Sequence, residues 1–321
     1  MLKMQAWACV FFGVPSSAIA WFHARSGADF RQLCFACVAE LGNMTNHARL
    51  PASWPSVSVV IPTLNEAKNL PHVFGRLPDG IHEVIVVDGH SDDDTCATAL
   101  RLRPDARIVM QNRSGKGNAL ACGFAVATGR IIVMLDADGS ADPGEIPAFV
   151  QALLDGADFA KGSRFAPGGG SSDLTRLRTW GNRLLMAMVN RAYGTAYTDL
   201  CYGFNVFWRR HLPVLRLDST TPPPQDGTER LWGDGFEIET LIAIRVTVAR
   251  LGVVEVPSFE HSRIHGVSNL TAFSDGLRVL RTIFAERRAR QMAMGMADSF
   301  SDTDIVEEFA SLRTPSSREA E

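Results

Sequence analysis

Two aspartates, Asp136 and Asp138, stand one residue apart where the apolar run "IIVML" (131–135) ends. Carboxylate oxygens are the ligands that hard divalent cations such as Mg²⁺ and Mn²⁺ prefer in proteins. An acidic loop on the protein surface would carry the same two residues. The pair therefore leaves two interpretations open, a solvated loop or a cation site, and the surrounding elements have to distinguish them.

Short runs rich in valine and isoleucine precede these and other polar residues. They predict β-strands over 57–62, 83–88, 107–111 and 130–136. Continuous rather than alternating apolar residues are typical of strands that are buried on both faces of a parallel sheet. The intervening segments predict helices over 66–77, 92–102 and 115–127. This alternation predicts an α/β fold with a mostly parallel central sheet flanked by helices.

Polar residues gather where three of these strands end. Thr63, Asn65 and Glu66 follow the first strand, Asp88 ends the second, and the aspartate pair follows the fourth. A single acidic residue at such a place is more often a turn or helix-capping residue than a ligand. In open α/β sheets, however, ligands bind beyond the carboxyl ends of the strands. Three such clusters at one edge therefore favour a binding site.

The overall composition is that of a globular protein. The 321 residues are 46% hydrophobic and 21% charged, with a formal net charge of −3. A chain of this length can bury a full core, and its charge gives no general attraction for nucleic acid, so no nucleic-acid partner is expected. The six cysteines show no disulfide-framework spacing, and Cys34 and Cys37 form a lone C-x-x-C. Free thiols in a reducing cytosol are expected.

Three regions are expected along the chain. Residues 1–54 form an N-terminal extension whose apolar segment, 6–22, is slightly short for a membrane span of about 20 residues. This segment also resembles a signal peptide, and a third interpretation places the natural start at Met44. Residues 55–290 form a single catalytic domain, and the mostly polar residues 291–321 are expected to be a disordered tail.

Four sequence motifs occur in an order that resembles the family 2 glycosyltransferases: "VVIPTLNEAKNL", "VVDGHSDDDT", "GKGNAL" and "VMLDADGSADP". Members of this family have the GT-A fold, a Rossmann-like α/β sheet that binds a nucleotide. The resemblance covers residues 56–290. Within the family, the chain is most similar to the dolichol-phosphate and polyprenyl-phosphate mannosyl- or glucosyltransferases, through "KGSRFAPGGG", "DLCYGFNVFWR" and "HSRIHGVSNL".

The resemblance implies a site for a nucleotide-sugar donor. The residues expected to bind its nucleotide are Pro62, Thr63, Asn65, Glu66, Asp88, Lys116, Asp136 and Arg263. Asp136 and Asp138 would bind Mg²⁺ or Mn²⁺, which stabilises charge on the departing nucleotide, so Asp138 is also a catalytic candidate. A bend in the motif would leave Asp138 alone on the metal and turn Asp136 toward the ribose or a metal-bound water. The competing interpretations are that Lys116 marks a simple turn and that Arg263 is a surface arginine.

A second group of residues resembles the acceptor-phosphate cluster of the family. It consists of Arg164, Arg178 and Asn182, with Asn182 at a position where a serine is usual. Guanidinium groups suit a phosphate monoester, and Arg178 and Asn182 share one face of a predicted helix. Arg164 is therefore also a catalytic candidate. The alternative is a basic helix in solvent.

The chemistry of the acceptor determines whether a general base is needed. A phosphate monoester, with a second pKa of about 6, is largely dianionic at pH 7 and can attack the anomeric carbon unaided. A hydroxyl needs a positioned carboxylate, for which Asp234, in the loop 221–235, is the catalytic candidate. Glu237 and Glu239 have a simpler explanation, because acidic residues at the start of a helix interact favourably with its dipole.

Three positions depart from the family pattern. Gly89 replaces a second aspartate after the "VVD" strand, Ser140 stands where a glutamine metal ligand is usual, and Asn269 replaces a lysine. They bear, respectively, on the nucleotide contacts, on the metal ligands and on the positive charge near the diphosphate.

A basic amphipathic helix is predicted over 269–290. Its apolar face would consist of Leu277, Leu280, Ile283 and Phe284, and its arginines are Arg278, Arg281, Arg287, Arg288 and Arg290. Such a helix can lie on an anionic membrane surface. The alternative is that it packs on the sheet. The expected location is the cytoplasm, with peripheral contact at the cytoplasmic face of the membrane.

Together these features lead to the hypothesis of an inverting, metal-dependent glycosyltransferase. It would move a hexose from a donor of the GDP-mannose or UDP-glucose class to polyprenyl or dolichyl phosphate. The alternative acceptor is a hydroxyl of a saccharide, a lipid or a small phosphorylated molecule, in cell-envelope or exopolysaccharide synthesis. A hypothesis from another class is a non-catalytic protein that binds nucleotide sugars.

Overall fold

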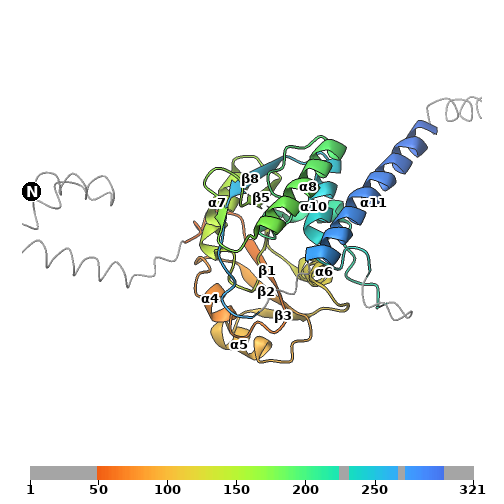
Figure 1. Ribbon diagram of the computed structural model, residues 1–321. Coiled ribbons are helices and arrows are strands. Elements are labelled where there is room, and N and C mark those ends of the chain that lie inside the picture. The colour runs from red at the N-terminus through yellow and green to blue at the C-terminus, as the bar shows by residue number, and fades with distance from the viewer. Residues whose placement is uncertain (1–48, 224–230, 267–271, 300–321) are drawn as a thin grey trace, which may run out of the picture. The chain divides into compact units, whose positions relative to one another are not determined.

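The computed structural model describes residues 49–223, 231–266 and 272–299 (Figure 1). The chain divides into two compact units, 1–46 and 47–321. The first unit, and with it nearly all of the predicted N-terminal extension, lies outside the described residues. The remainder of this section concerns the second unit.

Within the described residues, seven strands form one sheet in the order β3-β2-β1-β4-β7-β5-β8. Their bounds are β1 Val57–Thr63, β2 Glu83–Asp88, β3 Arg107–Met110, β4 Ile131–Met134, β5 Phe159–Ser163, β7 Asn205–Trp208 and β8 Val253–Pro257. β7 is antiparallel to β4 and β5, and the other pairings in this sheet are parallel. The predicted mostly parallel sheet is therefore confirmed. A second, two-stranded sheet pairs β6 Gly170–Ser171 with β9 Phe259–Glu260.

Helices connect the strands, close to the predicted places. Their bounds are α4 Leu70–Phe74, α5 Thr95–Leu102, α6 Lys116–Val126, α7 Ile146–Leu154, α8 Arg176–Tyr193, α9 Leu212–Leu215, α10 Ile238–Val248 and α11 Ala272–Ser299, with 3₁₀ turns at Pro143–Glu145 and Arg209–His211. The helix predicted over 66–77 is only five residues long. Glu66 and Asn69 form turns before it, and it ends at Gly75.

Alternate residues of the central strands bury against different helices. Val57, Val59 and Ile61 of β1 pack in one cluster with α4 and α7, whereas Val60 packs in the other cluster with α6 and α10. Both faces of the sheet are thus covered, as the continuous apolar runs predicted. The sheet holds its strand ends rigidly because it is buried between two layers of helices.

A third apolar cluster joins α8, α10 and α11, which lie side by side in Figure 1. The Tyr193 hydroxyl of α8 donates a hydrogen bond to the Ile283 carbonyl of α11 at 3.0 Å. Of the predicted apolar face, Ile283 is buried, whereas Leu277 and Phe284 are exposed, so only part of this face packs on other described residues. α11 packs on other helices rather than on the sheet. It continues to Ser299, so residues 291–299 of the predicted tail are helical.

Helix length and composition also bear on the membrane hypothesis. In the part of the chain that the structure describes, no helix combines the length and the apolar character that crossing a bilayer requires.

Candidate functional site

The aspartate motif lies on a turn directly after β4. The chain bends at residues 137–139, and Gly139 has a positive φ of 76°. This φ favours glycine, and a Cβ at Gly139 would lie 2.6 Å from the Ile264 side chain, which would then have to move. The bend turns Asp136 toward Lys116 and Asp138 toward Arg263. The two carboxylates therefore do not point the same way, as a bent motif predicts.

Lys116, the first residue of α6, lies between two carboxylates. Its Nζ is 2.7 Å from Asp136 Oδ1 and 2.6 Å from Glu239 Oε1. Burial alone would lower the pKa of Lys116, but the charges of Asp136 and Glu239 outweigh burial and raise this pKa above its ordinary value. The lysine stays charged and holds Asp136 in place. A Cβ at Gly203, just before β7, would lie 2.7 Å from both Lys116 Nζ and Asp136 Oδ2.

Arg263 bridges the first and third strand-end clusters. Its Nη1 lies 3.0 Å from Glu66 Oε1 and its Nη2 lies 3.1 Å from Asp138 Oδ2. Burial raises the pKa of Glu66, although Asn69 and Arg263 partly oppose this effect. The Asn69 side chain also exchanges two hydrogen bonds with the backbone of His265, at 3.0 and 3.1 Å. Residues near 263 are thus held over the aspartate turn, although they lie more than a hundred positions away in the sequence.

The residues predicted to hold the nucleoside end are mostly engaged with one another. Asn65, at a φ of 59°, accepts a hydrogen bond from the backbone of Asp92 at 2.8 Å. The Thr63 hydroxyl donates to the Val87 carbonyl at 3.3 Å. Pro62 pairs in register with Val87, beyond the last β1–β4 pair, where its missing N–H costs no hydrogen bond. These residues fix the edge of the sheet, and their contact with a nucleotide stays a prediction.

Arg164, directly after β5, is held by two carboxylates. Its Nε and Nη2 donate to Asp199 at 2.6 and 2.9 Å, and its Nη1 lies 3.1 Å from both oxygens of Glu260. Burial alone would lower the pKa of Arg164, but hydrogen bonds and charge from Asp199 outweigh it and raise the pKa. The predicted phosphate ligand is thus already paired in the absence of an acceptor.

The other two predicted acceptor residues lie on α8, and one of them reaches the same network. Arg178 pairs with Asp173 at 3.2 Å, and Asn182 accepts a hydrogen bond from the backbone of Leu200, next to Asp199, at 3.3 Å. The Nδ2 atom of Asn182 is buried and has no hydrogen-bond partner among the described residues. The structure therefore places Arg164 and Asn182 at the 199–200 segment, whereas Arg178 is paired with Asp173.

Asp234 has a partner that the sequence did not indicate. Its carboxylate forms a two-pronged pair with Arg113, with Nε–Oδ2 at 2.8 Å and Nη2–Oδ1 at 2.9 Å, and both side chains are almost fully buried. A carboxylate saturated in this way is poorly placed to take a proton from a hydroxyl. The pair gives Asp234 a structural task, and its role as a base stays a prediction.

The same pair fixes the turn that carries Lys116. The Asp234 carbonyl accepts a hydrogen bond from Gly117 N at 2.7 Å. A Cβ at Gly117 would lie 1.8 Å from the Gly233 carbonyl oxygen, so the "GKG" turn and the "WGDG" turn touch backbone to backbone. Both glycines of the "GKG" motif are needed because a side chain at either position would clash with the backbone of residues 233–234.

The donor atoms at the aspartate turn suit a hard divalent cation. Asp138 and Asp136 supply carboxylate oxygens, and Mg²⁺ is commonly held by one or two carboxylates together with substrate phosphates and water. No group of three or more His, Cys, Asp or Glu side chains that could hold a metal occurs within 49–223, 231–266 and 272–299. The residues present therefore fit a cation that is shared with a bound diphosphate rather than one held in a protein cage.

Several residues of this edge were missed by sequence reasoning. They are Arg113, Lys161, Asp199, Glu239 and Glu260. Lys161 of β5 is 1% exposed, and burial lowers its pKa, against the charges of Asp199 and Glu255. For Glu239 the sequence signal is its place at the start of a helix, which favours a dipole interaction and gives no sign of the contact with Lys116. The others lack a local pattern, because their partners lie in distant segments.

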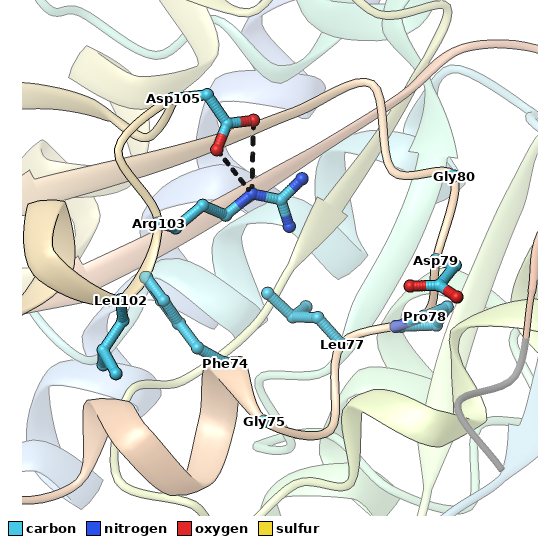
Figure 2. Close-up of a pocket in the computed structure, with 9 residues that line it drawn as sticks. All are labelled: Phe74, Gly75, Leu77, Pro78, Asp79, Gly80, Leu102, Arg103 and Asp105. Atoms are coloured by element: carbon cyan, nitrogen blue, oxygen red, sulfur yellow. Dashed lines mark hydrogen bonds and ion pairs between the residues drawn. The ribbon is translucent and has the colours of Figure 1, made fainter. Parts of the chain in front are cut away.

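One cavity among the described residues lies elsewhere. Its volume is ≈ 390 Å³. Figure 2 shows residues that line it, among them Phe74, Leu77, Asp79, Arg103 and Asp105. Its residues lead into β2 and β3, so it lies at the amino-terminal edge of the sheet, opposite the aspartate turn. Its one ion pair, Arg103 with Asp105 at 3.2 Å, is internal.

Comparison with known proteins gives relatives for most of this region. A family model described as Glycosyl transferase family 2 matches residues 58–215. A polyprenol monophosphomannose synthase of Mycolicibacterium smegmatis is 33% identical over 215 residues, covering 61% of this chain and 78% of that relative. An uncharacterized glycosyltransferase of Mycobacterium tuberculosis is 42% identical over 109 residues, 34% of this chain. That match spans only about half of the relative, 49% of its length.

Solved structures share the arrangement of the sheet. The crystal structure of glucosyl-3-phosphoglycerate synthase from M. tuberculosis, in complex with Mn²⁺, UDP and glucosyl-3-phosphoglycerate, is 25% identical. It covers 72% of this chain and 79% of that chain, with a TM-score of 0.54. This likeness confirms the predicted GT-A type of fold.

Proposed function

Because this chain belongs to glycosyl transferase family 2, we propose that it moves a hexose from a nucleoside diphosphate sugar to a polyprenyl phosphate, with inversion and with a divalent cation. The relative from M. smegmatis, matched over most of its length, is named for a reaction of this kind. The observation that carries the proposal is the gathering of two charged clusters at one edge of the sheet, the aspartate turn and the Arg164 network.

On the donor side, each charged residue has a separate task. A cation bound at Asp138 and Asp136 would supply Lewis-acid charge to the diphosphate. Lys116 holds Asp136 by its ion pair and keeps that carboxylate turned into the site. Arg263 is partly exposed and lies 3.1 Å from Asp138, so it can exchange this carboxylate for a diphosphate oxygen without leaving the turn.

On the acceptor side, Arg164 and Asn182 would receive the phosphate. Asp199 is fully buried, whereas Glu260 is partly exposed, so an incoming phosphate would replace Glu260 on Arg164 and leave Asp199 in place. The free Nδ2 of Asn182 would donate a second hydrogen bond. Because a phosphate dianion attacks unaided, the absence of a free base at Asp234 is compatible with this acceptor.

One observation favours the alternative acceptor. The solved relative with Mn²⁺ and UDP also holds a glucosylated phosphoglycerate, according to its description. A hydroxyl on a small phosphorylated acceptor is therefore the second candidate.

A lipid acceptor requires contact with a membrane, and α8 supplies a suitable face. Six exposed residues recur on one side of this helix: Arg176, Trp180, Arg183, Leu184, Ala187 and Arg191. We call this set the α8 face. Trp180 is 73% exposed and Leu184 60%, and the 18 residues of α8 include four arginines and no acidic residue. Exposed tryptophan and leucine beside arginine suit an anionic lipid surface.

An acceptor assay tests the proposal. With radiolabelled GDP-mannose or UDP-glucose, Mn²⁺ and a polyprenyl phosphate, we expect a chloroform-soluble product that is labile to mild acid. Arg164→Ala is expected to reduce transfer to the lipid about 100-fold, because it removes a charged hydrogen-bond donor. Arg103→Ala, which removes an arginine paired with Asp105 at the opposite edge of the sheet, is the control. A water-soluble product from a phosphorylated small acceptor, without lipid product, would replace the proposal with the alternative.

A further inference from the structure

Gly89 has no side chain, and the side chain of Gln111 occupies the space beside it. Gly89 follows β2, and Gln111 follows β3, the neighbouring strand. The backbone N–H of Gln111 donates to the Asp88 carbonyl at 3.1 Å. A Cβ at Gly89 would lie only 3.2 Å from Gln111 Nε2. The Gln111 amide thus occupies the place that a side chain at residue 89 would take.

The carboxylate of Asp88 is already satisfied. It accepts hydrogen bonds from Ser91 N at 2.8 Å, Ser91 Oγ at 2.6 Å and Thr63 Oγ1 at 3.3 Å, and the residue is 2% exposed. A base could bind this carboxylate only by displacing one of these partners. Asp88 therefore shapes the pocket but is poorly available to read the nucleotide.

The amide of Gln111, by contrast, is available. Gln111 is 8% exposed, and none of the hydrogen bonds between described residues involves its amide oxygen or nitrogen. Its main-chain carbonyl is fixed by the His90 ring at 3.0 Å, which holds the residue in place. The amide atoms of Gln111 are not among the fully buried polar atoms without a partner, so a ligand can reach them from solvent. Gln111 lies at the carboxyl edge, where this class of sheet binds nucleotides.

We propose that Gln111 reads the base of the donor nucleotide and makes the site selective for uracil over guanine. A carboxamide offers one acceptor and one donor side by side. Uracil presents an N–H beside a carbonyl, which matches that pair. Guanine also presents an N–H beside a carbonyl, but it carries a further amino group on the other side of that N–H. Gly89 leaves no carboxylate at residue 89 that could accept from both N–H groups. The inference rests on the proposed function and specifies its donor as a uridine diphosphate sugar.

Calorimetric titration with UDP and with GDP, each in the presence of Mn²⁺, tests this inference without any turnover. The wild-type protein is expected to bind UDP at least about tenfold more tightly than GDP, because guanine paired with the Gln111 amide leaves its exocyclic amino group without an acceptor. Gln111→Ala is expected to lose this preference by weakening UDP alone. Gln111→Glu, of nearly the same shape, is expected to shift the preference toward GDP. Gln151→Ala is the matched control, since Gln151 is exposed on α7 and pairs with Asp155.

The possible results distinguish a failure of the base-selectivity inference from a failure of the proposed function. Failure of both nucleotides to bind wild-type protein would overturn the proposed function and the inference together. Tighter binding of GDP than of UDP would overturn the inference alone. Equal weakening of both nucleotides by Gln111→Ala and by Gln111→Glu would do the same, since a merely structural glutamine would give that result. Circular dichroism of each variant confirms that it is folded.

Discussion

The charged residues of the aspartate turn are each paired with a residue of opposite charge. Lys116 is paired with Asp136 and Glu239, Arg263 with Glu66 and Asp138. An ion removed from water is stable only when such partners replace its hydration. The carboxylates of the site are therefore ion-paired with the lysine and arginine of the same site. A ligand must exchange these pairs rather than enter an empty pocket.

The buried pair of Arg113 and Asp234 gives a prediction at this scale. Removing one member leaves the other charge buried without a partner, so Arg113→Ala or Asp234→Ala is expected to cost about 3–5 kcal/mol in the free energy of unfolding. The double variant is expected to cost little more than either single one. Urea denaturation of the four proteins measures this coupling. Full additivity, together with a stable Asp234→Ala protein that has lost activity, would restore Asp234 as a catalytic base.

At the scale of elements, the antiparallel strand β7 divides the edge into two halves. β1, β2, β3 and β4 end on one side of it with the aspartate turn, and β5 and β8 end on the other side with Arg164. The segment that enters β7, from Asp199 to Gly203, touches both clusters. Donor and acceptor sites can thus lie next to each other because one segment runs between them.

The α8 face is expected to bind anionic vesicles. Each arginine near such a surface contributes about 1 kcal/mol, and the exposed apolar side chains add to this. In sedimentation at low salt, the protein should pellet with phosphatidylglycerol vesicles but not with phosphatidylcholine vesicles. The double variant Trp180→Ser, Leu184→Ser should remain in the supernatant. Leu100→Ser, which changes an exposed leucine of α5, is the control for loss of apolar surface.

A variant of α11 separates the two helices that have been considered for this contact. Phe284→Ser removes the most exposed apolar side chain of the face predicted from sequence. If this change abolishes vesicle binding while the α8 double variant still binds, the contact belongs to α11 and the α8 face is wrong.

At the scale of the whole molecule, residues from most of the described chain meet at one edge. Glu66, Asp138 and Arg263 form one ion-pair bridge between the first loop and the last segment before α11. A ligand that binds across these contacts stabilises the folded state as a whole. Its effect should therefore appear in global unfolding and not only at the site.

Thermal unfolding with nucleotide and metal tests this statement. At a concentration 100 times its dissociation constant, a ligand stabilises the native state by about 2.7 kcal/mol. UDP or GDP with Mn²⁺ should raise the melting temperature, and omission of the metal should remove most of the rise. Asp138→Asn should lose the metal-dependent part, whereas Asp142→Asn, nearby but paired with Arg76, should keep it. An equal rise with and without Mn²⁺ in the wild type would argue against a metal at this turn.

Sequence alone determined the layers of the fold and the edge at which the site lies. Continuous Val/Ile runs require burial on both faces, and this dictates a parallel sheet covered by helices. The carboxyl ends of parallel strands meet at one edge of the sheet, so polar residues that follow them lie close together. For this reason the sequence predicted Asp136, Asp138, Glu66 and Lys116 as site residues. These are local signals, carried by neighbours in the chain.

The tertiary structure alone decided which charges are free. Arg113 reaches Asp234 across more than a hundred positions, and Arg164 reaches Glu260 across nearly as many. No local pattern encodes such pairs, because their energy depends on burial and on distances set by the whole fold. For that reason the sequence did not indicate that Asp234 is paired with Arg113, and Gln111 was overlooked although its amide has no hydrogen bond to another described residue.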